Sequence, residues 1–147
     1  MMKTSLFLLP LFLFCFLSPA HAVDSQLSFP LEHAMQSGKV LSALHKDIAL
    51  YWGARKTPAI VQNFGHFKTS KRTNGLGKSK QDACDWALAS AIVTLQKRAV
   101  REGGNAVINL KSNLNNNPVS STTTYECLAG SLIINVALTG DVVKLAR

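Results

Sequence analysis

The chain has 147 residues, and its 16 lysines and arginines outnumber its 8 aspartates and glutamates, which gives a formal net charge of +8. This length holds one domain and excludes multidomain enzymes. The excess of positive charge favours anionic partners.

Residues 1–22 are predicted to be a secretory signal peptide. An almost wholly apolar run, Leu6 to Leu17, follows Lys3 and leads into Ala20-His21-Ala22, where cleavage after Ala22 is expected. Cys15 lies inside that run, and the large residues before it do not form the pattern of a lipidated cysteine. Residues 23–147 contain no apolar stretch long enough for a membrane helix. We therefore expect a single periplasmic or secreted domain of charge +7, without a transmembrane segment or lipid anchor.

The N-terminal part of this domain predicts one short helix. A polar opening, residues 23–28, precedes Phe29–Met35, where Pro30 fits the first turn and Gly38 fits a helix end.

Two strands and a loop are expected next. Ile48–Trp52 and Ala59–Thr69 have the composition of strands, and Gly65 indicates a bulge in the second. Ser70–Lys80 is rich in glycine and cations and has no hydrophobic period, so it predicts a loop.

The longest periodic segment predicts a helix that ends at Glu102. Ser79 and Asp82 form a plausible capping pair at its start, and Gly103-Gly104 ends it with a tight turn in which Asn105 can cap the reversal. At 100° per residue one apolar stripe faces the core. The stripe consists of Cys84, Ala87, Leu88, Ala91, Ile92, Leu95 and Ala99.

The C-terminal part is predicted to be mostly strand. Asn105–Leu110 is followed by the loop Lys111–Ser121, by the long strand pattern Thr122–Leu138, bent at Ala129-Gly130, and by a short edge strand, Asp141–Leu145. The element order predicts an α+β fold. An antiparallel sheet of about four or five strands is crossed by one long helix, with a short N-terminal helix and one disulfide.

The expected disulfide joins Cys84 to Cys127. These are an even pair in a chain bound for an oxidising compartment. In the chain-entropy model, closing a loop of about 43 residues destabilises the unfolded state by about 4 kcal/mol. A redox-active pair is the alternative, but its usual spacing is C-x-x-C. No metal or cofactor is expected, since His33, His45 and His66 show no paired ligand spacing.

A second apolar row on the long helix marks a candidate interface. Trp86, Val93 and Val100 recur at seven-residue spacing on the side away from the stripe. Either the N-terminal segment, residues 29–44, folds over this row, or the row is a homo-oligomer or partner interface anchored by Trp86.

An acid-free run of cations is the candidate anion-binding surface. Its members are Lys68, Lys71, Arg72, Lys78 and Lys80. Gly77-Lys78-Ser79 matches only the end of a phosphate loop, because Arg72 stands where the first glycine belongs. The run is either a solvated loop or a contact for an envelope polyanion such as acidic lipid head groups, lipopolysaccharide phosphates or an acidic protein. Nucleic acid fits the charge but not the compartment.

No motif for catalysis is present, so we expect a non-enzymatic domain. The serines lack a nucleophile elbow, and no acids have a suggestive spacing. The alternative is an exported, hydrolase-like enzyme whose catalytic side chains are far apart in the sequence and come together only in the folded structure.

Several runs in the second half resemble a family of small exported proteins of Gram-negative bacteria. They are Arg72-Thr73-Asn74, Cys84-Asp85-Trp86-Ala87, Gly103-Gly104-Asn105-Ala106-Val107, Tyr125-Glu126-Cys127-Leu128-Ala129-Gly130 and Val136 to Leu145. The family has no known function and is often labelled an excinuclease ATPase subunit. The Walker motifs and zinc-binding cysteines of that ATPase are absent here. More loosely, the helix and the following turn and hairpin are similar to the outer-membrane stress sensor of the Rcs system and to YbjQ-like proteins. The first resemblance supplies a family without an activity, and the second supports the fold more than the function. With the cationic run and the Trp86 row as candidate contact surfaces, we expect an envelope interaction or stress-related binding module.

Overall fold

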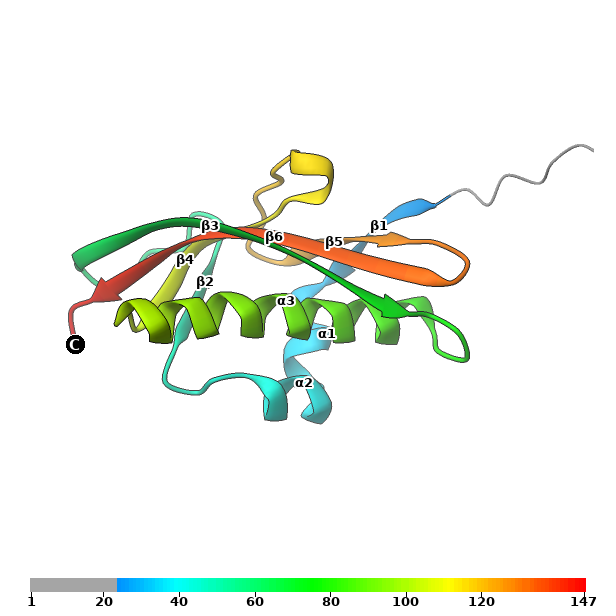
Figure 1. The fold of residues 1–147 in the computed structure, drawn as a ribbon, viewed down its shortest axis with the longest axis horizontal. Coiled ribbons are helices and arrows are strands. Elements are labelled where there is room, and N and C mark those ends of the chain that lie inside the picture. Colours follow the sequence, from blue (N-terminus) through cyan, green and yellow to red (C-terminus); the bar gives the residue numbers. More distant parts are fainter. Residues whose placement is uncertain (1–23) are drawn as a thin grey trace, which may run out of the picture.

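A long helix lies along one face of a curved sheet (Figure 1). The computed structural model describes residues 24–147, so the predicted signal peptide lies outside the described residues. The elements are β1 (Ser25–Pro30), α1 (Leu31–Gln36), α2 (Gly38–Ala43), β2 (Ala49–Trp52), β3 (Ile60–Asn74), α3 (Lys80–Glu102), β4 (Ala106–Ser112), the 3-10 turn η1 (Leu114–Asn116), β5 (Thr124–Ala129) and β6 (Ile133–Leu145). This confirms the α+β class and the long helix packed on a sheet.

The strand β6 organises the sheet. Along one edge it pairs antiparallel with β3, and along the other with β5 near its start and β4 nearer its end. Beyond these, β1 pairs antiparallel with β5, and β2 pairs parallel with β4. The prediction of four or five antiparallel strands is therefore only partly right. The structure has six strands in the described chain. One pair is parallel because β3 and α3 intervene between β2 and β4 and bring the chain back in the same direction.

The core lies between α3 and the sheet. All seven residues of the predicted apolar stripe are buried, because the 3.6-residue period keeps them on the face that meets the sheet. Cys84 on α3 is joined to Cys127 on β5, with 6.0 Å between their Cα atoms. The disulfide thus joins helix to sheet near one end of the molecule. In the described part of the chain, no helix is long and apolar enough to cross a membrane.

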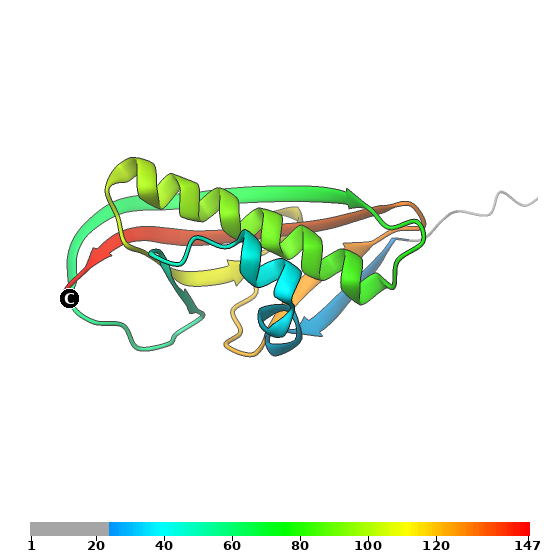
Figure 2. The same ribbon diagram turned by 90° about the horizontal axis from the view of Figure 1, so that it is seen from below.

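The N-terminal segment packs on the flank of α3 as two helical turns, α1 and α2 (Figure 2). Gln96 of α3 fastens it: its side chain accepts from the backbone N–H of His45 and donates to the carbonyl oxygens of His45 and Ile48. α1 ends at Gln36, and the backbone of the next residue, Ser37, is extended. Gly38 is the first residue of a second short helix, α2. The prediction of one short helix that ends at Gly38 is therefore wrong.

Four further predictions about the strands are also wrong. The polar opening, for which no strand was predicted, contains β1, which pairs with β5. β3 continues to Asn74, so half of the expected loop 70–80 is strand, because those residues pair with the first half of β6. The bend expected at Ala129-Gly130 is a hairpin turn that separates β5 from β6. Residues 141–145 are the end of central β6 and form no separate edge strand. The bulge expected at Gly65 is present as a register shift.

The turn after α3 has the predicted structural role. Gly103 is left-handed, with φ of 83°, and its N–H bonds the last turn of the helix. A Cβ on Gly104 would lie 2.8 Å from the carbonyl oxygen of Val143, so only glycine fits there. Asn105 then bonds both the N–H and the carbonyl oxygen of Leu145 through its side chain.

Candidate functional site

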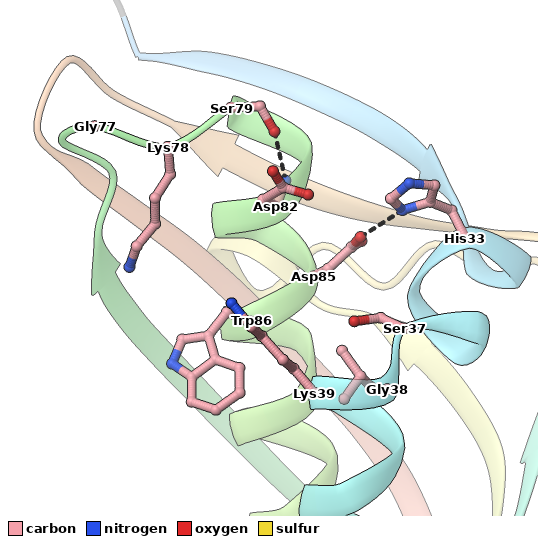
Figure 3. A pocket seen from close by; sticks show the side chains of 11 residues that line it. His33, Ser37, Gly38, Lys39, Gly77, Lys78, Ser79, Asp82, Asp85 and Trp86 are labelled. Atoms are coloured by element: carbon pink, nitrogen blue, oxygen red, sulfur yellow. Dashed lines mark hydrogen bonds and ion pairs between the residues drawn. The ribbon is translucent and has the colours of Figure 1, made fainter.

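A pocket of about 770 Å³ opens beside the first turns of α3. The β3–α3 loop and the start of α3 line one side, and the α1–α2 segment lines the other (Figure 3). Ser79 fixes the position of the helix, since its Oγ accepts a hydrogen bond from the backbone N–H of Asp82 at 3.0 Å. Lys78 precedes the cap, and Asp85 and Trp86 follow it about two helical turns later. The pocket therefore brings Lys78 of the predicted cationic run next to Trp86 of the predicted interface row.

The wall of the pocket contains a buried carboxylate whose two oxygens are both engaged. Asp85 is 4% exposed. Its Oδ1 accepts from the hydroxyl of Tyr125 at 2.5 Å, and its Oδ2 lies 2.6 Å from Nδ1 of His33. Burial above all raises the pKa of Tyr125 well above its usual value, and the hydrogen bond and charge of Asp85 add to it. Tyr125 therefore stays protonated and donates to Asp85.

His33 joins the N-terminal segment to this carboxylate. α1 presents the ring at the pocket, and half of its side chain is exposed. Nδ1 faces Asp85, and the ring's other nitrogen, Nε2, forms no hydrogen bond with any residue in the described part of the chain. Sequence reasoning missed the pair because 52 residues separate His33 from Asp85. The available signal was an aspartate that directly follows a buried cysteine on the helix.

Two lysines that line the pocket, Lys39 and Lys78, are available to contact a ligand. Lys78 extends from the β3–α3 loop and Lys39 reaches across from α2, both towards the side of the helix where Trp86 lies (Figure 3). Neither forms an ion pair with any described residue. Lys78 makes only a 3.5 Å contact to the carbonyl oxygen of Asn74. Asp82, the other acid of the pocket, lies in the first turn of α3, where the helix dipole favours a carboxylate.

The predicted apolar row is only partly covered. α1 and α2 pack against the neighbouring face of α3, where Ala89 and Gln96 are buried. Trp86 stays 42% exposed and Val100 is also exposed, whereas Val93 is half-buried. The N-terminal segment thus lies beside the row, and Trp86 also lines the pocket.

The other predicted cations are divided between the two faces of the sheet. β3 alternates, so Lys68 and Arg72 lie on the exposed face while half-buried Lys71 lies on the helix side. Lys68 donates to the side chain of Asn116 at 3.4 Å. Lys80 begins α3 and lines a smaller hollow shared with Lys78. No ion pair in residues 24–147 involves any of these five cations.

A second His–Asp pair lies on the far face of the sheet. His66 Nδ1 is 2.6 Å from Asp141 Oδ1, and its Nε2 is 2.5 Å from Thr139 Oγ1. The order of these groups resembles a catalytic triad. However, Thr139 is buried and its hydroxyl also bonds the carbonyl oxygen of Phe67. The cluster therefore ties β3 to β6 and offers no accessible nucleophile. Within residues 24–147, no three His, Cys, Asp or Glu side chains gather as a metal site.

Comparison with known proteins finds a remote structural similarity. No family model and no curated protein sequence matches the chain. The fold is similar to the 2.73 Å crystal structure of a protein of unknown function, of the DUF74 family, from Pediococcus pentosaceus ATCC 25745. The TM-score is 0.45 at 13% identity, over 67% of this chain and 98% of that one. Neither predicted resemblance, to the excinuclease-labelled family or to the Rcs stress sensor, is tested by this similarity.

Proposed function

We propose that the protein is a non-enzymatic binding module of the bacterial envelope, exported to the periplasm, that recognises an anionic group in the pocket beside α3. The observation that carries the proposal is the convergence of Lys39 and Lys78 on the exposed indole of Trp86. Two ammonium groups supply charge for a phosphate or carboxylate, and the indole supplies apolar contact area. The disulfide is compatible with an oxidising compartment.

The acids of the pocket do not cancel this charge at the binding surface. Asp85 is buried behind its bonds to Tyr125 and His33, and Asp82 is neutralised in part by the helix dipole. The lysines have no such partners in the described chain. An incoming anion therefore meets two unpaired cations without having to displace an existing ion pair.

An exported hydrolase is the second candidate, and the His33–Asp85 pair favours it. Such a pair can make a histidine a general base. A nucleophile would have to lie within hydrogen-bond reach of His33, but among residues 24–147 the ring bonds Asp85 alone. Binding requires no such group, so the binding module agrees better with the geometry.

Calorimetry with a soluble polyanion tests the proposal. We expect inorganic tripolyphosphate to bind the exported, disulfide-bonded protein, with an affinity that falls as salt is raised. Lys39→Ala/Lys78→Ala should weaken binding by about tenfold or more, because both charges contact the anion. The matched control, Lys97→Ala/Arg101→Ala, removes two exposed cations from the other end of α3 and should bind as the unaltered protein does. Equal loss in both variants would contradict a localised site.

A further inference from the structure

One end of the molecule is built from two turns that are fixed to each other. The β3–α3 loop, residues 75–79, and the β5–β6 turn, residues 130–132, both lie there (Figure 1). The backbone N–H of Gly75 donates to the carbonyl oxygen of Leu132 at 2.9 Å, and Asn74 pairs with Ile133. The two turns therefore form one tip, in which hydrogen bonds and strand pairing fix one turn against the other.

Three large aliphatic side chains are exposed on this tip. Leu76 is 62% exposed, Leu132 is 53% exposed and Ile133 is 54% exposed. Single exposed apolar residues are ordinary, but three on adjoining turns form a patch that water solvates poorly. No other described segment covers them. We call Leu76, Leu132 and Ile133 the apolar tip.

Cations surround the apolar tip. Lys78 and Lys80 line a hollow of about 330 Å³ together with Gly130 and Ser131 of the adjoining turn. Lys71 and Arg72 lie just before the end of β3. None of the four has an ion-pair partner in residues 24–147. The acids at this end are Asp24, which lies against Gly130, and Asp82, so positive charge is in excess.

We propose that this end of the protein docks on an anionic lipid bilayer. The apolar tip enters the boundary between head groups and acyl chains, while Lys71, Arg72, Lys78 and Lys80 contact lipid phosphates. Long cationic side chains can do this because their stems follow apolar surface while their charged ends stay in the head-group layer. Exposed side chains that are all aliphatic suit a fluid lipid surface, whereas a protein partner is usually bound through aromatic anchors. The proposal deepens the proposed function, on which it rests for the anionic partner.

Vesicle sedimentation tests the docking. The exported protein is mixed with phosphatidylethanolamine vesicles that contain phosphatidylglycerol, and with neutral phosphatidylcholine vesicles. We expect binding to the anionic vesicles alone. Leu76→Ser/Leu132→Ser/Ile133→Ser should lower that binding by about tenfold or more, since three aliphatic side chains no longer leave water. The matched control, Ile60→Ser/Val61→Ser/Val100→Ser, alters three exposed aliphatic residues elsewhere and should bind unchanged.

Insertion depth supplies a second measurement. In Leu76→Trp, lipids brominated on the acyl chains should quench the new tryptophan beyond the quenching seen in the unaltered protein. Val61→Trp should show no added quenching.

The outcomes separate this proposal from the anion pocket. Tripolyphosphate binding without vesicle binding would overturn the membrane proposal and leave the pocket standing. Vesicle binding that needs the apolar tip, without tripolyphosphate binding, would support the membrane proposal and overturn the pocket. Vesicle binding that is indifferent to the tip substitutions would overturn the membrane proposal.

Discussion

At the scale of single residues, the account depends on Asp85. This carboxylate receives the hydroxyl of Tyr125 from the sheet and the ring of His33 from the N-terminal segment. It therefore links three parts of the chain at the edge of the pocket. The disulfide beside it could be predicted, because residues 23–147 contain only two cysteines and the sequence predicts export to an oxidising compartment. The Asp85 cluster could not, because nothing in the sequence specifies which distant side chains converge on a carboxylate.

Tyr125→Phe should destabilise the protein, most strongly at neutral pH. The substitution leaves Asp85 Oδ1 without its buried donor, which costs about 1–3 kcal/mol of unfolding free energy. Urea denaturation measures this. Tyr51→Phe is the control, since the Tyr51 hydroxyl has no hydrogen bond to any described residue. Equal stability of Tyr125→Phe and the unaltered protein would show that the bond does not stabilise the fold.

The raised pKa of Tyr125 gives that experiment a pH dependence. The pKa in the folded state lies above the unfolded value of about 10, so the stabilisation is complete below pH 10 and is lost as the pH rises further. Between about pH 10 and 11.5, the unaltered protein should lose stability more steeply than Tyr125→Phe. Parallel curves would contradict a buried, protonated Tyr125.

At the scale of elements, local signals predicted α3 well and strand boundaries poorly. Ser79, the apolar stripe and Gly103 each act within a few residues, and each has its expected role. The end of β3 depends instead on pairing with β6 some 60 residues away, which overrides the loop-like composition of residues 70–74. β1 and the parallel β2–β4 pair depend on non-local partners in the same way. Consequently, the sequence predicted that Lys78 lies in the loop before α3 and that Trp86 lies on α3. It could not predict that Lys39 of α2 lines the same pocket.

Ser79→Ala should cost about 1 kcal/mol of unfolding free energy, because the N–H of Asp82 loses its cap. It should also weaken tripolyphosphate binding slightly, since Lys78 stands directly before the cap. Ser90→Ala is the matched control. Its hydroxyl bonds the carbonyl oxygen of Trp86 within the helix, and its removal should be nearly neutral in urea denaturation. A Ser79→Ala protein as stable as Ser90→Ala would show that the cap contributes little.

At the scale of the whole molecule, charge and exposed apolar surface gather at the end where α3 begins. The N-terminal helices, the β3–α3 loop and the β5–β6 turn meet there, and the disulfide holds the first turns of α3 to β5 nearby. The other end carries the C-terminal turn of α3, where Arg98 pairs with Glu102 and lies over the ring of Phe67. The end where α3 begins thus leaves cations and aliphatic side chains free for a partner, whereas Arg98 at the other end is already paired.

The most direct test of the central claim is to locate the anion by NMR. The disulfide-bonded protein without its predicted signal peptide, residues 23–147, is labelled with ¹⁵N and titrated with tripolyphosphate while backbone amide and indole N–H signals are followed. The account predicts that the largest shifts fall on Lys39, Gly77, Lys78 and the indole of Trp86. It predicts unchanged signals at Lys97 and Arg101. Shifts centred on Lys97 and Arg101, or none at saturating tripolyphosphate, would contradict the pocket beside α3 as the binding site.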